Sequence, residues 1–326
     1  MLLAISAIIF GLVLLTLSAD KFVDAASSLA SHFGVSPLII GITVIGFGTS
    51  APEILVSIIA VLEDTPDIAI GNALGSNIAN IGLILGVTAF ITPIPIAKGL
   101  LRRELPLLII ATAILTGCLI DGSLDQIDGI TLILVLMAIL VFLIKSHRNT
   151  PNKHFIDNNL TAKASEDMTL MSAIVWVFLG LMILIASSKA LVWGATYIAL
   201  GLGVSELIIG LTVIALGTSL PELAASIASL KKGVPDMVIG NVIGSNLFNS
   251  LAVIGLPALL TNINIDSHAV SRDLPVVGGL TILLLCLSYF PTLPSQSLSR
   301  VKGALLLFSF FIYQLYLFFR VMTSYP

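Results

Sequence analysis

The stretch that decides the fold occupies residues 34–86 and reads GVSPLIIGITVIGFGTSAPEILVSIIAVLEDTPDIAIGNALGSNIANIGLILG. It occurs a second time at residues 203–255, as GVSELIIGLTVIALGTSLPELAASIASLKKGVPDMVIGNVIGSNLFNSLAVIG, with 27 identities over 53 positions and no gaps. The same offset of 169 residues pairs Gly11 with Gly180 and Arg103 with Arg272. We therefore interpret the chain as a duplication, with halves at residues 1–145 and 170–326 and a polar linker at residues 146–169.

The composition is that of a membrane protein. Of the 326 residues, 57% are hydrophobic and only 10% are charged, whereas soluble domains carry about 25% charged residues. Apolar runs of about 20 residues, the length that spans a bilayer, recur along the whole chain. Ten spans are predicted, at residues 2–19, 37–62, 68–91, 105–120, 130–144, 170–187, 207–230, 237–260, 274–290 and 301–319.

The basic residues support this count. When the loops are placed on alternating sides, one side receives only Lys189, Arg272 and Arg320. The positive-inside rule makes the other side cytoplasmic and puts both termini outside the cell membrane. The first span lacks a basic segment before it, which favours a retained helix over a cleaved signal peptide. The cytoplasmic side holds Lys21, Lys98, Arg102, Arg103, Lys145, Arg148, Lys153, Lys163, Lys231, Lys232, Arg300 and Lys302.

Five spans per half is an odd number, so the second half starts on the opposite side of the membrane from the first. The fold class predicted is an all-α membrane protein of ten transmembrane helices in two inverted-topology five-helix repeats. Transporters built in this way bind their substrate near the bilayer midplane, between the repeats. A duplication without mechanistic consequence is the alternative.

Two acids, Glu53 and Glu222, lie well inside apolar spans, at equivalent positions of the two halves. A carboxylate at this depth is costly and is normally paired or faces a polar cavity. No Lys or Arg lies at comparable depth, so the balancing charge is expected to come from bound cations or protons. The alternative is that both glutamates are protonated and only hydrogen-bonded.

Hydroxyl groups precede each acid in the motifs GTSAPE (48–53) and GTSLPE (217–222). On a helix, Thr49 and Ser50 share a face with Glu53, and Thr218 and Ser219 share a face with Glu222. Proline interrupts the helix just before each acid, so backbone carbonyls near Gly46 and Ala215 are expected to be free. Free carbonyls are tolerated at membrane depth where they line a cavity or bind an ion.

The next span of each half supplies further oxygen donors, Ser76 with Asn80 and Ser245 with Asn249. The whole predicted set contains oxygen ligands only, which suit Ca²⁺ or Na⁺ and not zinc, copper or iron, which take His, Cys or Met. No catalytic residue and no cofactor are expected. Helix–helix or turn hydrogen bonds are predicted for Asn72, Asn77, Asn241 and Asn246.

The charge of the site also predicts exchange. Two ionised glutamates are neutralised by one Ca²⁺ or two Na⁺, whereas an empty site keeps two uncompensated charges that are costly to enclose. Only loaded carriers are therefore expected to switch sides.

The pairs GTSAPE with GSNIAN and GTSLPE with GSNLFN resemble the cation/calcium antiporter superfamily, and each half resembles an alpha-repeat of the compact prokaryotic sodium/calcium exchangers. The resemblance implies two helices sliding against a core, and exchange of Na⁺ for Ca²⁺. Asn249 stands where potassium-dependent relatives carry Asp, which leans against potassium co-transport. The ion-binding positions that the resemblance implies are Gly46, Thr49, Ser50, Glu53, Ser76, Asn80, Ala215, Thr218, Ser219, Glu222, Ser245 and Asn249.

Three other functions are the alternatives to Na⁺/Ca²⁺ exchange. A Ca²⁺/H⁺ exchanger of the same superfamily would use the glutamates as proton carriers. A channel is disfavoured by the inverted, interrupted helices, and an intramembrane protease by the lack of a suitably placed Asp pair, Ser–His pair or metal motif. Partners are expected to be the ions and the bilayer, with no nucleic acid and no obligate protein.

Overall fold

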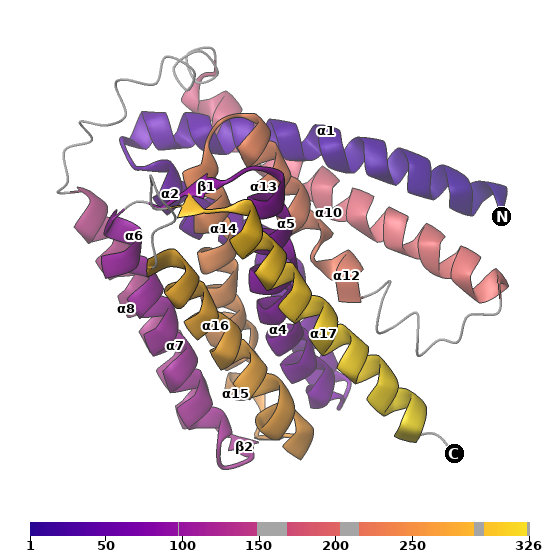
Figure 1. Ribbon diagram of the computed structural model, residues 1–326. Helices are drawn as coiled ribbons and strands as arrows, with labels where there is room; N and C mark the ends of the chain where they lie inside the picture. Colours follow the sequence, from indigo (N-terminus) through magenta and orange to yellow (C-terminus); the bar gives the residue numbers. More distant parts are fainter. Residues whose placement is uncertain (97, 149–167, 203–214, 290–296, 325–326) are drawn as a thin grey trace.

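The computed structural model describes residues 1–96, 98–148, 168–202, 215–289 and 297–324. This part of the chain is mostly helical (Figure 1). Within it, eight helical stretches are long and apolar enough to span a membrane, which agrees with the membrane class predicted from composition. They are Leu2–Phe33, Pro37–Leu62, Pro66–Ile91, Gln126–Ser146, Leu170–Gly201, Pro235–Leu260, Ala269–Tyr289 and Arg300–Arg320.

Two of the ten predicted spans are not among these eight. The span at 105–120 corresponds to α7 (Glu104–Leu119), whose 16 residues reach about 24 Å at 1.5 Å per residue, less than the ~30 Å hydrocarbon core. The span at 207–230 falls partly outside the described residues, and its described part forms α12 (Ala215–Thr218) and α13 (Leu220–Lys231). The count of ten therefore stays a prediction.

The two halves build their central helices in the same way. In the first half α2 (Pro37–Ile40), η1 (Gly41–Ile45) and α3 (Gly46–Leu62) follow one another, and then α4 (Pro66–Ala79), η2 (Asn80–Leu85) and α5 (Gly86–Ile91). In the second half α14 (Pro235–Phe248), η4 (Asn249–Val253) and α15 (Gly255–Leu260) repeat the second series. The elements η1, η2 and η4 are π-helical, and η2 and η4 begin at the equivalent residues Asn80 and Asn249.

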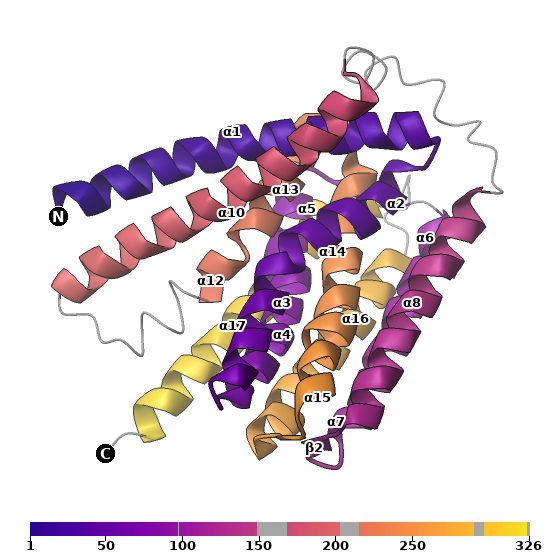
Figure 2. The same ribbon diagram turned by 180° about the vertical axis from the view of Figure 1, so that it is seen from behind.

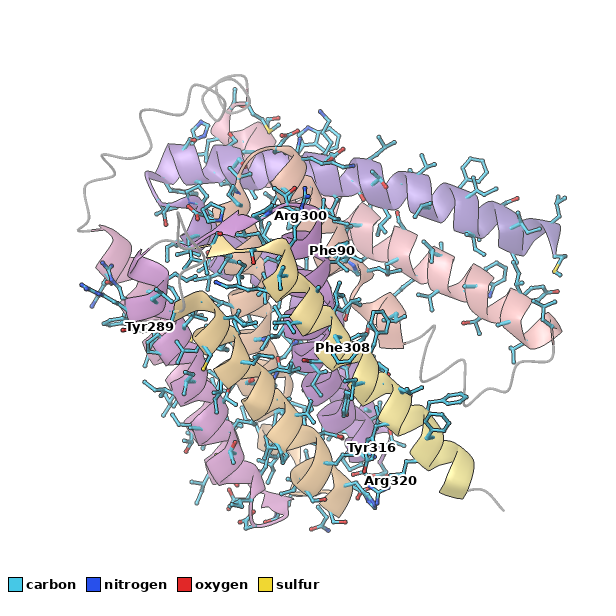
Figure 3. The ribbon with its side chains drawn as sticks, in the orientation of Figure 1. Phe90, Tyr289, Arg300, Phe308, Tyr316 and Arg320 are labelled. Carbon is cyan, nitrogen blue, oxygen red and sulfur yellow. The ribbon has the colours of Figure 1, made fainter. Side chains whose placement is uncertain are left out.

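The remaining helices complete the bundle. They are α6 (Lys98–Arg102) and α8 (Gln126–Arg148) in the first half, and η5 (Ala269–Asp273), α16 (Leu274–Tyr289) and α17 (Arg300–Ser324) in the second. Along α17, Phe308 and Tyr316 are exposed, and Arg320 donates a hydrogen bond to the Tyr316 hydroxyl at 3.4 Å (Figure 3). Exposed aromatic and basic side chains on an apolar helix are typical of a surface that meets lipid.

The first helix of each half is longer than predicted. Spans ending at residues 19 and 187 were expected, but α1 runs over Leu2–Phe33 and α10 over Leu170–Gly201, each with 32 residues. The extension of α1 keeps Phe22 and Val23 buried, while Asp24 forms an ion pair with Lys232 at 2.7 Å. The helix α1 lies across one end of the bundle, beside α10 (Figures 1 and 2), and the ion pair neutralises Asp24 in this position.

The fold is helical apart from four very short strands, in agreement with the predicted all-α class. Four two-residue strands form two antiparallel ribbons, β1 (Ile94–Pro95) with β4 (Ser297–Leu298), and β2 (Ser123–Leu124) with β3 (Ile263–Asn264). Each ribbon joins one strand of the first half to one of the second. The strands β1 and β3 are equivalent under the 169-residue offset. Each of them pairs with a strand of the opposite half, β1 with β4 and β3 with β2.

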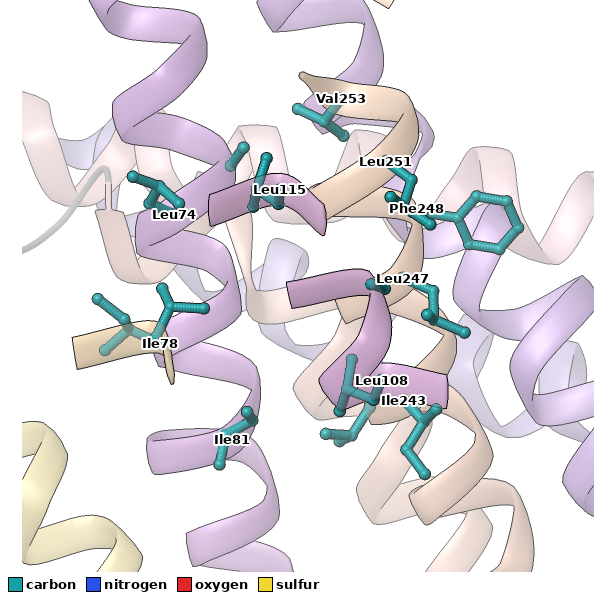
Figure 4. Packing of buried hydrophobic residues seen from close by; sticks show 14 of the residues in the cluster. Leu74, Ile78, Ile81, Leu108, Leu115, Ile243, Leu247, Phe248, Leu251 and Val253 are labelled. Carbon is teal, nitrogen blue, oxygen red and sulfur yellow. The ribbon is translucent and has the colours of Figure 1, made fainter. Parts of the chain in front are cut away.

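A common hydrophobic core lies between the halves, where α4 and η2 meet α7, α14 and η4. Figure 4 shows part of this cluster, including Leu74, Ile78, Ile81, Leu108, Leu115, Ile243, Leu247, Phe248, Leu251 and Val253.

Two glycines on α14 let the backbone of the first half approach closely. A Cβ at Gly240 would lie 2.5 Å from the Leu38 carbonyl oxygen, and one at Gly244 would lie 2.3 Å from that of Ile42. Small residues allow such close helix contact inside membranes. The contact places Ser245, the residue after Gly244, beside the start of α3.

Candidate cation site

The two predicted acids are buried and close together. Glu53 on α3 is 1% exposed and Glu222 on α13 is 2% exposed. The Glu222 carboxyl interacts electrostatically with Glu53 and lies near the Thr49 side chain. Neither glutamate takes part in an ion pair within the described residues. Both carboxylates thus face the interior without a basic neighbour, as the sequence predicted.

Equivalent asparagines hold the backbone of each acid. Asn72 donates to the Glu53 carbonyl oxygen at 3.3 Å, and Asn241 donates to that of Glu222 at 3.2 Å. The same amide groups also donate to Ser57 and to Ser226, at 3.4 and 3.0 Å. These bonds agree with the helix–helix role predicted for both asparagines, and they fix the acids against α4 and α14.

A cluster of hydroxyls joins α3 to α14. The Thr49 hydroxyl lies 3.0 Å from the Ile45 carbonyl oxygen, 3.3 Å from Asn241 Oδ1 and 3.4 Å from Ser245 Oγ. Ser245 in turn contacts the Gly46 carbonyl oxygen at 3.5 Å. The structure therefore brings together four groups predicted for one site, Gly46, Thr49, Ser245 and Glu222.

Amide groups cross between the repeats at the π-helical turns. Asn80 donates to Asn246 Oδ1 at 3.1 Å, and Asn77 donates to Ser250 Oγ at 2.8 Å. These bonds agree with the role predicted for Asn77 and Asn246. Asn249, the equivalent of Asn80, forms no such hydrogen bond in the described residues. Both polar atoms of its side chain are buried without a partner.

The remaining predicted residues lie on α3, α4 and the segment of α12 and α13. Ser50 and Ser219 are buried, and their hydroxyls have no hydrogen-bond partner in the described structure. Ser76 is buried on α4, and Thr218 is half-buried at the end of α12. Ala215 begins α12, as Gly46 begins α3.

An interruption of the helix just before the acid was predicted for both halves. The structure shows it before Glu222 in the second half, but not before Glu53 in the first half, where the prediction was wrong. The chain leaves the helix at Ser219, between α12 and α13, and the Gly217 carbonyl oxygen accepts a hydrogen bond from Ser188 at 2.8 Å. In the first half, α3 stays helical through Pro52 and the irregular turn lies earlier, in η1.

The unpartnered oxygens define what the site can bind. Buried polar atoms in proteins are normally hydrogen-bonded, so a cluster without partners needs an explanation. Here the atoms are oxygens of carboxylates, hydroxyls and amides, the ligand types that hard cations such as Ca²⁺ and Na⁺ take. They are Ser50 Oγ, Glu53 Oε1 and Oε2, Asn80 Oδ1, Ser219 Oγ, Glu222 Oε2 and Asn249 Oδ1.

Sequence reasoning missed two further buried acids, Glu104 and Asp273, which are 0% and 7% exposed. They occupy equivalent positions at the ends of apolar spans, where burial was not expected. Asp273 accepts hydrogen bonds from Arg272 and from the Tyr313 hydroxyl, the latter at 2.7 Å. The repeated Arg-acid-Leu-Pro pattern was the available signal, and these contacts give Asp273 a structural role.

The chain belongs to the sodium/calcium exchanger protein family, whose model matches residues 3–145 and 172–319. It is therefore a membrane protein of the cation/calcium antiporter superfamily, as the resemblance implied. A putative antiporter, CaxA of Alkalimonas amylolytica, is 43% identical over 98% of this chain and 99% of its own length. The inner membrane protein YrbG of Escherichia coli (strain K12) is 42% identical, with 88% and 89% covered.

The fold is that of a solved exchanger. The sodium–calcium exchanger NCX_Mj, soaked with 10 mM Na⁺ and 10 mM Sr²⁺, superposes with a TM-score of 0.80 at 32% identity, covering 95% of this chain and 97% of its own. The sodium/calcium exchanger MaX1 of Methanosarcina acetivorans is 28% identical, with 85% and 89% covered.

Proposed function

We propose that this protein is a secondary active antiporter that exchanges Na⁺ for Ca²⁺ across the cell membrane by alternating access. The observation that carries the proposal is the pair Glu53 and Glu222, both buried, interacting electrostatically, and without an ion-pair partner in the described residues. Oxygens of the same repeated motifs are also buried without hydrogen-bond partners. Family membership and the names of MaX1 and NCX_Mj support the choice of ions.

The site works by charge balance. One Ca²⁺ or two Na⁺ neutralise two ionised carboxylates, and the surrounding hydroxyl and amide oxygens replace water around the ion. An empty site would carry two negative charges in a medium that solvates them poorly. Movement of the empty carrier is therefore slow, and inward and outward transport are coupled. This is transport without chemical change of the ion, so no catalytic residue and no cofactor are assigned.

The ligands are assigned from the repeated motifs that contain the two acids. In the first half they are Gly46 (carbonyl oxygen), Thr49, Ser50, Glu53, Ser76 and Asn80, and in the second half Ala215 (carbonyl oxygen), Thr218, Ser219, Glu222, Ser245 and Asn249. Asn249 adds no charge to the set, which leans against potassium as a co-substrate.

The proposed architecture is ten transmembrane helices in two inverted five-helix repeats, residues 1–145 and 170–326. The reciprocal ribbons β1–β4 and β2–β3 support it, since a two-fold arrangement requires each connection to occur twice. The linker at 146–169 is assigned to the cytoplasm and both termini to the outside, on the distribution of Lys and Arg. No obligate protein partner is assigned.

The alternative is Ca²⁺/H⁺ exchange at the same site. The observation that favours it is that Glu53 and Glu222 have no basic partner within the described residues, so protons can neutralise them as well as Na⁺.

The test is uptake of radiolabelled Ca²⁺ into proteoliposomes, driven by an outward Na⁺ gradient or by a pH gradient. Wild-type protein is expected to take up Ca²⁺ with the Na⁺ gradient and not with the pH gradient alone. Glu53→Gln and Glu222→Gln are each expected to abolish uptake, while Glu63→Gln, an exposed acid just after α3, leaves it unchanged. Uptake driven by the pH gradient in place of Na⁺ would establish the alternative.

A further inference from the structure

A single lysine interrupts the apolar helix α10. Lys189 is the only charged residue among its 32 positions, and its side chain is exposed. None of the ion pairs in the described residues includes it. An ionised side chain on a lipid-exposed helix is costly unless an opposite charge reaches it. The ion site does not use this residue, so its partner must be sought elsewhere.

A cavity of about 250 Å³ opens beside Lys189, between α10 and the helices that carry the two glutamates. Among the described residues that line it, the polar side chains besides Lys189 are Ser188 and Thr218, and Ser188 is already bonded to the Gly217 carbonyl oxygen at 2.8 Å. The rest of the wall is apolar and is formed by Pro52, Val56, Ile185, Val192, Trp193 and Pro221. The cavity thus combines an apolar interior with one cation at its edge.

Two aromatic side chains continue the face that bears Lys189. Trp193 and Tyr197 follow at successive four-residue intervals, which places all three on one side of the helix. Their ring centroids are 5.8 Å apart, and they are 47% and 51% exposed. Trp and Tyr on an exposed apolar helix are typical of the layer where lipid headgroups begin. Lys189 therefore lies within reach of headgroup phosphates.

The first half has no such arrangement. Under the 169-residue offset, Lys189 corresponds to Asp20 and Trp193 to Asp24. Asp24 is paired with Lys232 at 2.7 Å, whereas Lys189 lacks a protein partner in the described residues. The basic and aromatic face beside the cavity is therefore specific to the second half.

We propose that this cavity is a binding site for an anionic phospholipid. One acyl chain fills the apolar space between α10, α3 and α13, and the headgroup phosphate pairs with Lys189. The positive charge of Lys189 selects the headgroup, because its attraction to an anionic headgroup is stronger than its attraction to a zwitterionic headgroup of zero net charge. One lysine near a membrane surface corresponds to a preference of about fivefold for anionic over zwitterionic lipid.

Tryptophan fluorescence tests the proposal directly, because the chain has only two tryptophans. In the Trp176→Phe variant, Trp193 in the cavity wall is the sole emitter. The protein is reconstituted in phosphatidylcholine vesicles that contain increasing fractions of either dibrominated phosphatidylglycerol or dibrominated phosphatidylcholine, whose bromines quench nearby indole rings. Quenching of Trp193 is expected to require about fivefold less of the brominated anionic lipid.

Three variants complete the design. Lys189→Gln is expected to remove the difference between the two lipids, and Lys189→Arg to keep it. The Trp193→Phe variant reports from Trp176, a 37% exposed position on the same helix that does not line the cavity, and is expected to show no headgroup preference. Equal quenching of Trp193 by both lipids, or a preference that survives Lys189→Gln, would overturn the proposal. Neither result depends on whether the protein exchanges ions.

Discussion

The substitution Gly244→Ala tests whether close helix contact builds the ion site. A Cβ at Gly244 would lie 2.3 Å from the Ile42 carbonyl oxygen and 2.7 Å from the Ile42 Cα. Ordinary contact begins near 3.4 Å, so the start of the first-half helix must move away from α14 by about 1.1 Å. Both groups that clash belong to the backbone, so no side-chain rotation relieves them.

The site lies one residue away from this contact. Ser245 touches the Thr49 hydroxyl at 3.4 Å and the Gly46 carbonyl oxygen at 3.5 Å. Both distances are at the limit of a hydrogen bond, so a displacement of about 1 Å removes both. Misplacement of binding groups by about 1 Å costs on the order of 100-fold in rate, and overpacking costs about 1–3 kcal/mol of stability.

The assay is Na⁺-driven Ca²⁺ uptake into proteoliposomes, together with the midpoint of thermal unfolding in detergent. Gly244→Ala is expected to lower uptake about 100-fold while eluting as a monodisperse, folded protein with a reduced midpoint. The matched control is Gly278→Ala on α16, where no described atom lies within 4 Å of an added Cβ, and it is expected to behave as wild type. Wild-type uptake and stability in Gly244→Ala would refute the reasoning.

Three further outcomes are expected. Asp64 has a left-handed backbone with φ 57°, where its equivalent Gly233 has φ 71°, so Asp64→Gly is expected to raise stability by about 0.5–1 kcal/mol in thermal unfolding; a fall would contradict it. Tyr313→Phe removes the 2.7 Å hydrogen bond to buried Asp273 and is expected to cost about 1–3 kcal/mol, measured in the same way; no change would show that the bond contributes nothing. With Asn249 neutral, replacing K⁺ by choline is expected to leave Na⁺-driven Ca²⁺ uptake unchanged, and a requirement for K⁺ would reverse that assignment.

Much of the central architecture could be predicted, because the chain repeats itself. The offset that pairs Asn80 with Asn249 also pairs the π-helical turns that begin there. The same offset placed Glu53 and Glu222 at equivalent depths, and the absence of basic residues in those spans indicated that they would lie unpaired. Periodicity and charge were sufficient for this part of the fold.

Other features depend on contacts that a single sequence does not reveal. The first span was predicted to end at residue 19, before Asp20 and Asp24, yet the helix continues to Phe33, and Asp24 pairs with Lys232 of the other half. The same motif bends differently in the two halves, since the Gly217 carbonyl oxygen has Ser188 as a partner while the first half adjusts in η1. The two-residue strands are too short to give an alternating pattern.

Equilibrium Ca²⁺ binding to the purified protein tests the central claim most directly, namely that the buried carboxylates of Glu53 and Glu222 hold the transported cation. Wild-type protein is expected to bind Ca²⁺ and to release it as Na⁺ is added, and the double variant Glu53→Gln/Glu222→Gln is expected to bind none. Unchanged Ca²⁺ binding in a folded double variant would contradict the account.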